Sequence, residues 1–195
     1  VSGANWLVTV GVVRSFLQKT GLEYEQLLAL LDLRFINPGR DIRVVDLDQS
    51  CDTDKKVVGV LDPAKLDRIY RFLRLWRKLK GWQMWELDLV LEHQRIGAGA
   101  LDEAFLVQFF EFCLLKKRLG DKATVEQICG LFGDLNTWGP FTKPHERRGA
   151  ALYQSVFLNR RLIHPLDSTC EIDPATNDIR PIVDPVTTLI TQHRV

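Results

Sequence analysis

The stretch LDPAKLDRIYRFLRLWRKLKGWQMWELDLVLEHQ, residues 61–94, decides the fold because it contains a complete helical hairpin. Asp62 is a candidate N-cap, and Pro63 takes the first helical position, where its missing N–H costs no hydrogen bond. Gly81 ends this helix and a shorter apolar helix follows. At 100° per residue, one face of the first helix is apolar and contains Leu66, Ile69, Phe72, Leu73, Trp76 and Leu79.

The same arrangement of a long amphipathic helix, a glycine and a short amphipathic helix occurs three times. The glycine and short helix read GLEYEQLLALL at 21–31, GWQMWELDLVL at 81–91 and GDKATVEQICGLF at 120–132. The alignment superposes Gln26, Glu86 and Gln127. Each hairpin buries one face poorly alone and needs neighbours. The sequence therefore predicts a mainly α fold of stacked, irregular helical hairpins, the first opening with a helix over 5–19.

A different pattern separates the first two hairpins. The runs IRVVDLD (42–48) and KKVVGVL (55–61) are short and β-branched, which predicts a small β-hairpin inserted at about 42–61. We expect residues 1–164 to form the helical-hairpin domain, with a further short helix near 150–157. Residues 165–195 are rich in Pro and Asp and are expected to be extended, leading to a truncated helix.

Composition excludes several classes of protein. The formal net charge is +1, so the chain does not carry the basic excess typical of nucleic-acid binding. No apolar run approaches the length of a transmembrane helix, and the first residues lack the pattern of a signal peptide. The four cysteines are scattered, which favours reduced thiols over a disulfide framework or a zinc site; they are Cys51, Cys113, Cys129 and Cys170.

The acidic stretch DLDQSCDTD, residues 46–54, begins like a calcium loop. Side-chain oxygens occur at every second position. The sixth position should be glycine and the twelfth glutamate, but Cys51 and Val57 stand there. We therefore expect no metal site and interpret the stretch as a polar connection between two strands, while cation binding by 46–54 stays an alternative.

The helix after Pro63 carries a basic face that invites a phosphate-binding interpretation. Its members are Arg68, Arg71, Arg74, Arg77 and Lys78. The interleaved Phe72 and Trp76 belong to the opposite, apolar face, and no glycine-rich phosphate loop is present. We expect a solvated face, or one paired with acids such as Glu86, Asp88 and Glu92, and no nucleic-acid partner.

No catalytic constellation is apparent. The four histidines lie far apart without metal-ligand spacing, and no Gly-x-Ser-x-Gly nucleophile motif occurs; the histidines are His93, His145, His164 and His193. Trp76, Trp82 and Trp85 cluster around the Gly81 turn and are expected to be core side chains. We therefore expect a protein that is not an enzyme, with no catalytic, cofactor-binding or metal-binding residues and no cofactor.

Within the opening stretch, RFLRLWRK (71–78) is followed by GW (81–82) and ELD (86–88). This pattern resembles the A subunit of the insecticidal Tc toxin complexes, of the virulence-plasmid A protein family. CDTD (51–54) and ALYQSVFLNRRLIHPLD (151–167) also match, and the resemblance covers about 13–167. Lys80 is an additional residue before the Gly-Trp step.

The resemblance implies a structural role. Tc A subunits are large homo-oligomeric toxins in which a helical shell surrounds a translocation channel, and the toxic enzyme resides in another subunit. The chain is accordingly expected to be a fragment of that shell, without direct membrane insertion of its own. Its expected partners are other domains and protomers, and its expected location is secreted or on the bacterial cell surface. The alternative is a binding module that recognises a host receptor or a partner subunit, with the β-hairpin as the contact.

Overall fold

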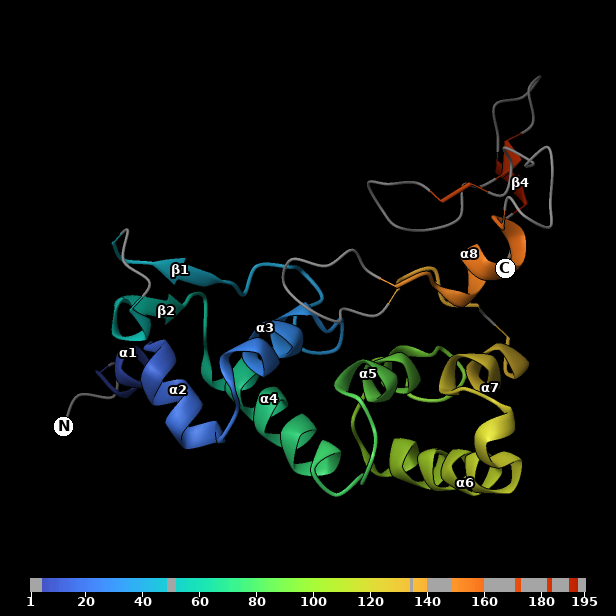
Figure 1. Ribbon diagram of the computed structural model, residues 1–195, viewed down its shortest axis with the longest axis horizontal. Coiled ribbons are helices and arrows are strands. Elements are labelled where there is room, and N and C mark those ends of the chain that lie inside the picture. The colour runs from blue at the N-terminus through green and yellow to red at the C-terminus, as the bar shows by residue number, and fades with distance from the viewer. Residues whose placement is uncertain are drawn as a thin grey trace.

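The computed structural model describes residues 5–48, 52–133, 135–139, 149–159, 171–172, 182–183 and 190–192. The fold is mainly α with a small antiparallel β-hairpin, as predicted (Figure 1). The helices are α1 (Asn5–Gly11), α2 (Val13–Thr20), α3 (Tyr24–Asp32), α4 (Pro63–Trp76), α5 (Met84–Glu92), α6 (Glu103–Leu119), α7 (Val125–Leu131) and α8 (Leu152–Phe157). The strands of the inserted hairpin are β1 (Val44–Asp46) and β2 (Lys56–Val58).

The long helices α4 and α6 begin in the same way. The carboxylate of Asp62 accepts a hydrogen bond from the N–H of Lys65 at 2.8 Å, and that of Asp102 accepts one from the N–H of Phe105 at 2.8 Å. Each aspartate thus satisfies one of the backbone donors that a helix leaves unpaired at its start. These matching caps place α4 and α6 in register as two copies of one element.

The short helices are also capped alike. Gln26, Glu86 and Gln127 are each the third residue of their helix, and each accepts a hydrogen bond from the N–H of its N-cap residue, at 3.0, 2.8 and 2.9 Å. The predicted alignment of the three hairpins is thereby confirmed at the residues on which it rests. Gln154 of α8 makes the same bond to the N–H of Ala151, at 3.3 Å. The helix α8 therefore repeats the short-helix start a fourth time, which the sequence alignment did not include.

The turns after α3 and α5 follow one backbone path. The N–H of Asn37 donates to the carbonyl of Leu33 at 2.9 Å, and the N–H of Gly97 donates to the carbonyl of His93 at 2.9 Å. These two bonds occupy equivalent places in the first and second hairpins. The repeat therefore extends beyond the helices into the connections between them.

One carbonyl in each turn is satisfied by different means. The side-chain amide of Asn37 donates to the carbonyl of Leu31 at 3.0 Å. At the equivalent carbonyl of Leu91 the donor is the N–H of Gly99, at 2.9 Å. Gly97 stands where Asn37 stands in the first copy, and a Cβ atom there would lie 2.1 Å from the Leu91 oxygen. Glycine is thus required at this position of the second copy.

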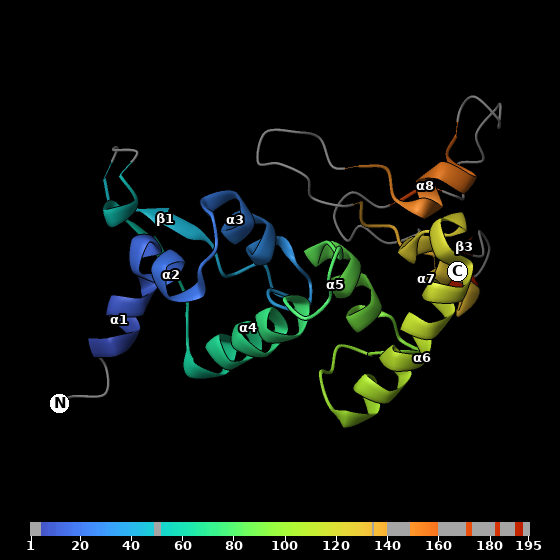
Figure 2. The ribbon, with the colours of Figure 1, turned by 60° about the horizontal axis from the view of Figure 1, so that its bottom comes forward.

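The hairpins stack with their short helices side by side. The helices α3, α5 and α7 contact one another in sequence order, and α4 and α6 run along the other side of this row (Figures 1 and 2). One continuous apolar core fills the space between the two rows. Its fully buried members include Phe16 of α2, Leu27 and Leu30 of α3, Phe72 of α4, Leu87 and Leu91 of α5, Phe112 of α6 and Ile128 of α7.

The inserted β-hairpin ends the first helix of the chain earlier than predicted. Instead of one helix over 5–19, α1 stops at Gly11 and α2 starts at Val13. Val12 is extended, with φ −62° and ψ 126°, and forms an isolated antiparallel bridge with Val57. Pairing with the hairpin therefore replaces one step of the helix, a long-range contact that local periodicity does not contain.

The two predicted strands are confirmed, in antiparallel register with Val44 opposite Val58 and Asp46 opposite Lys56. Further along the chain, β3 (Ile182–Val183) pairs antiparallel with β4 (Ile190–Gln192). The helix predicted towards the end of the sequence therefore does not include the three residues of β4. The remaining residues of 184–195 lie outside the described part.

A strained residue follows the hairpin. Val60 has φ 58°, a left-handed conformation that crowds a β-branched side chain, and its side chain is 60% exposed. We expect Val60→Asn to raise the free energy of unfolding by about 0.5–1 kcal/mol, because asparagine tolerates this conformation and little buried area is lost. Urea denaturation of the wild type and the variant measures this difference in unfolding free energy. Val45→Asn, exposed but on a strand, is the matched control and should be neutral or destabilising; equal effects from both changes would contradict strain at Val60.

Candidate functional site

The most distinctive side chain of the molecule joins the first two hairpins. Asp88 of α5 is only 8% exposed and accepts hydrogen bonds from two successive backbone N–H groups, those of Arg34 at 3.0 Å and Phe35 at 2.8 Å. Both donors belong to the turn that follows α3. The carboxyl group therefore satisfies backbone donors that would otherwise be buried and unpaired at the junction of two hairpins.

Charged groups surround this junction. The guanidinium of Arg68, on α4, donates to the carbonyl of Phe35 at 3.2 Å and lies over the Phe35 ring at 5.6 Å from its centroid. Glu92, one turn beyond Asp88 on α5, is close enough to Arg34 and Arg68 for both to act on its charge. The turn after α3 is thus bound from α5 through its N–H groups and from α4 through a carbonyl.

Burial dominates the electrostatics of the two acids. It raises the pKa of Asp88 to about 7, while the N–H groups of Phe35 and Arg34 act in the opposite direction. Burial also raises the pKa of Glu92, opposed by the charges of Arg34 and Arg68. A carboxyl group that holds its proton near neutral pH can still accept both backbone hydrogen bonds, so the junction is maintained in either state.

The raised pKa of Asp88 makes the stability of the junction depend on pH. The folded chain keeps this proton up to about pH 7, whereas the unfolded chain releases it near the ordinary value of 3.8. The folded state therefore binds more protons between these values, and its stability falls as the pH rises from about 4 to about 7. We expect Asp88→Asn, which cannot titrate, to gain on the order of 3 kcal/mol relative to the wild type between about pH 4.5 and about pH 8.

Urea unfolding of both proteins at several pH values measures this effect. The quantity to compare is the difference in unfolding free energy between the wild type and Asp88→Asn, because the titration of all other groups cancels in it. A difference that stays constant from about pH 4.5 to about pH 8 would show that the pKa of Asp88 is not raised.

An aromatic side chain from a later segment covers the same region. Trp138 has the guanidinium of Arg40 over its ring at 4.1 Å and that of Arg34 at 5.2 Å. Arg40 also forms an ion pair with Asp32, at 2.9 Å. Stacking of planar guanidinium groups on an indole is favourable, so Trp138 joins the segment after α7 to the first hairpin.

A shallow cavity of about 370 Å³ lies beside the junction, between α4 and the start of α6. Its charged lining consists of Asp67, Arg68, Arg71 and Asp102. Arg68 and Arg71 donate to the carbonyls of Phe35 and Leu101, and Asp102 caps α6. Most of the charged side chains around the cavity therefore form hydrogen bonds with backbone groups.

The basic face of α4 has partners that the sequence did not indicate. Three arginines donate to backbone carbonyls of other segments: Arg68 to Phe35, Arg71 to Leu101 and Arg77 to Thr20. The prediction paired this face with acids, and Arg68 does act electrostatically on Glu92. Arginine suits this task because its fork of donors reaches several directions at once.

The acidic stretch is neutralised by basic side chains. Asp52 accepts from the N–H of Asp54 at 2.9 Å, which closes the start of a 3₁₀ turn at Thr53–Lys55. Residues 49–51 lie outside the described part, and within the remainder no cluster of three or more metal-ligand side chains occurs. The ion pairs join Asp46 to Lys56, Asp48 to Lys55 at 2.7 Å and Asp54 to Arg14 at 2.5 Å.

The predicted tryptophan cluster is partly core. Trp82 packs edge-on against Phe109 of α6, with centroids 5.4 Å apart, and the indole N–H of Trp76 donates to the carbonyl of Trp82 at 2.8 Å. All three tryptophans, Trp85 included, are only partly buried against the core. They fix the Gly81 turn and its contact with the third hairpin rather than filling the centre of the fold.

The remaining candidates of the sequence are dispersed. Cys129 is buried, and Cys113 is half-buried on α6. His93 is buried and packs edge-on against Phe132, at 6.3 Å between centroids. The other three histidines, with Cys51 and Cys170, lie outside the described residues.

Comparison of the chain with protein-family models, with curated proteins and with solved structures finds no match. In the described ranges, no helix combines the length and the apolar character needed to cross a membrane.

Proposed function

We propose that this chain is a non-catalytic structural module, a part of the helical shell of a large Tc-like toxin A subunit that assembles into a pore-forming complex for protein translocation. The observation that supports the structural role is that charged side chains bind backbone groups. Asp88, Arg68, Arg71 and Arg77 all bind backbone groups of neighbouring segments. Such bonds fix neighbouring hairpins against one another in a stack, which is what a structural module requires.

The assignment to a toxin rests on the sequence. The resemblance at 71–88 includes residues of α4 and α5 that build the junction, among them Phe72 and Asp88. Under this proposal the partners are other domains and protomers of the same assembly, and the complex acts outside the bacterium or at its surface. Stacked hairpins suit a shell because each unit adds a further layer to one continuous core.

Electron microscopy of the full natural polypeptide tests this proposal. An antibody fragment raised against the β1–β2 hairpin marks the position of this chain in the particles. We expect large homo-oligomeric particles with the label on a helical shell around a channel. Small particles without a channel, or a label that lies on a separate enzymatic domain, would contradict the proposed function.

A second function is favoured by a specific observation. The β-hairpin region exposes three large apolar side chains, Val45, Leu47 and Val60. Exposed apolar side chains on an inserted element are typical of a contact with another protein. If the chain is a binding module, Leu47→Asp should abolish binding to its receptor or partner subunit. If the chain is a structural module, the same variant should form the same particles and bind as the wild type does.

A further inference from the structure

The helix α6 has a second apolar face besides the one that enters the core. Phe105, Phe109 and Phe112 are buried, whereas the opposite side carries exposed apolar residues. These residues, the outer face of α6, are Leu106 (48% exposed), Val107 (62%), Phe110 (60%) and Leu114 (37%). A helix that is apolar on both sides is normally covered on both sides.

Comparison with α4 shows that this face is not a requirement of the repeat. Because the N-caps Asp62 and Asp102 are equivalent, each position of α4 has a counterpart on α6, and buried Phe72 corresponds to buried Phe112. On the outer side, exposed Asp67, Tyr70 and Arg74 of α4 stand where α6 has Val107, Phe110 and Leu114. Two of these positions are therefore charged in α4 and apolar in α6, whereas Leu106 and Phe110 of α6 have the apolar Leu66 and the aromatic Tyr70 as their counterparts.

Three of the four residues in the outer face of α6 are arranged symmetrically about its centre. Phe110 lies in the middle, with Leu106 four residues before it and Leu114 four residues after it. Four residues are about one helical turn, so the two leucines flank the phenylalanine at equal distances along the axis. A face with this arrangement matches itself when a second helix runs in the opposite direction.

One pair of opposite charges on α6 follows the same symmetry. Glu103 lies seven residues before Phe110 and Lys117 seven residues after it, and both are exposed. In the described residues neither side chain takes part in an ion pair. An antiparallel neighbour would place its lysine beside this glutamate and its glutamate beside this lysine, and the helix dipoles would oppose each other favourably.

We propose that the outer face of α6 is an interaction surface for a second copy of this chain, with the two α6 helices antiparallel across a two-fold axis at Phe110. The helix runs along the lower edge of the fold in Figure 1, away from the β-hairpin. The contact is isologous, so it buries the same residues of both copies. It depends on the symmetry of this helix alone and stands or falls independently of the toxin resemblance.

The size of the face sets the expected affinity. The helix has 17 residues and is about 25 Å long, so a pair of such helices buries an area at the lower end of specific interfaces. We expect a reversible dimer with a Kd on the order of 10 µM. Sedimentation velocity between about 1 µM and about 200 µM should show its mass rising from monomer to dimer.

The first test removes the apolar centre. Phe110→Asp should leave the chain monomeric over the whole concentration range, because two carboxylates would then meet on the axis. Tyr70→Asp makes the same change at the equivalent, 61% exposed position of α4 and should leave the dimer unchanged. Circular dichroism and thermal melting of both variants establish that loss of the dimer does not reflect loss of the fold.

The second test uses the charges and does not depend on the apolar residues. Glu103→Lys alone and Lys117→Glu alone should each weaken self-association about tenfold, because like charges then meet at two symmetric places. An equimolar mixture of the two variants should recover the wild-type dimer, since the lysine pair of one chain then meets the glutamate pair of the other.

Three results would overturn the proposal. If the chain stays monomeric at about 200 µM, the outer face of α6 binds something other than a second copy, such as a helix of a different protein. A dimer that survives Phe110→Asp, or a mixture of charge variants that does not recover association, would place the contact elsewhere on the molecule. None of these results affects the electron-microscopic test of the toxin proposal.

Discussion

Replacing Asp88 with alanine should lower the free energy of unfolding by about 3–5 kcal/mol. The change leaves the N–H groups of Arg34 and Phe35 buried without their acceptor. An unpaired buried donor costs more than the hydrogen bond itself contributes, because it was desolvated on folding and gains nothing in return.

Two measurements separate this mechanism from a general weakening of the core. Urea denaturation gives the total loss of stability, and amide hydrogen exchange should show lost protection at Arg34 and Phe35 in particular. Asp67→Ala, which removes an exposed carboxylate from α4, is the matched control and should change stability by less than about 0.5 kcal/mol. Unchanged exchange at the two amides of Asp88→Ala would refute the role assigned to this carboxyl group.

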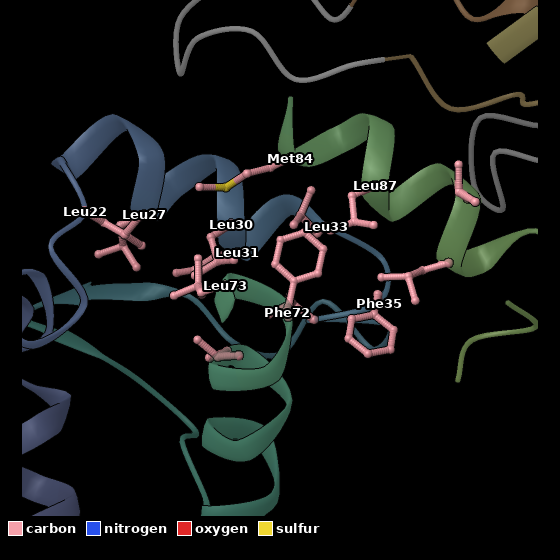
Figure 3. Packing of buried hydrophobic residues seen from close by; sticks show 14 of the residues in the cluster. Leu22, Leu27, Leu30, Leu31, Leu33, Phe35, Phe72, Leu73, Met84 and Leu87 are labelled. Carbon is pink, nitrogen blue, oxygen red and sulfur yellow. The ribbon is translucent and has the colours of Figure 1, made fainter. Parts of the chain in front are cut away.

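The second large effect concerns the apolar side of the same junction. Phe72 of α4 is fully buried and stacks on Phe35, with ring centroids 6.1 Å apart. Figure 3 shows its ring extending from α4 towards Leu33, which directly follows α3, and Leu87 of α5. We expect Phe72→Ala to cost about 3–5 kcal/mol, because a cavity forms where three segments meet and none can close it alone.

The control for this prediction lies two residues away. Tyr70 is on the same helix and is 61% exposed, so Tyr70→Ala keeps the helix and removes no core contact. Its effect on chemical denaturation should be below about 0.5 kcal/mol. Similar losses for both variants would mean that the helix itself, and not the burial of Phe72, was disturbed.

Features that depend on neighbouring residues could be predicted from the sequence. The apolar face of α4 and its Asp62–Pro63 start follow from spacing and capping preferences within one helix. The match of Gln26, Glu86 and Gln127 could be found because each side chain returns to a backbone group only three residues earlier. Such short-range bonds leave a pattern that repeats wherever the unit repeats.

Features that depend on residues far apart in the sequence could not be predicted from it. The sequence predicts Asp88 as an acid available to the basic face, but its partners are backbone N–H groups 53 and 54 residues away. Val12 ends α1 because of a strand that follows much later in the chain. The signal that Asp88 differs is its place among the buried positions of α5, between Leu87 and Val90, where a charge is costly unless backbone donors meet it.

The two ways of satisfying the Leu31 and Leu91 carbonyls show how such a chain can diverge. A side-chain amide does in the first turn what a backbone amide and a glycine do in the second. One backbone path is thus compatible with two quite different local sequences, provided that both members of each pair change together. Tandem duplication followed by paired substitutions would leave copies that keep the same backbone structure after their sequences have become dissimilar.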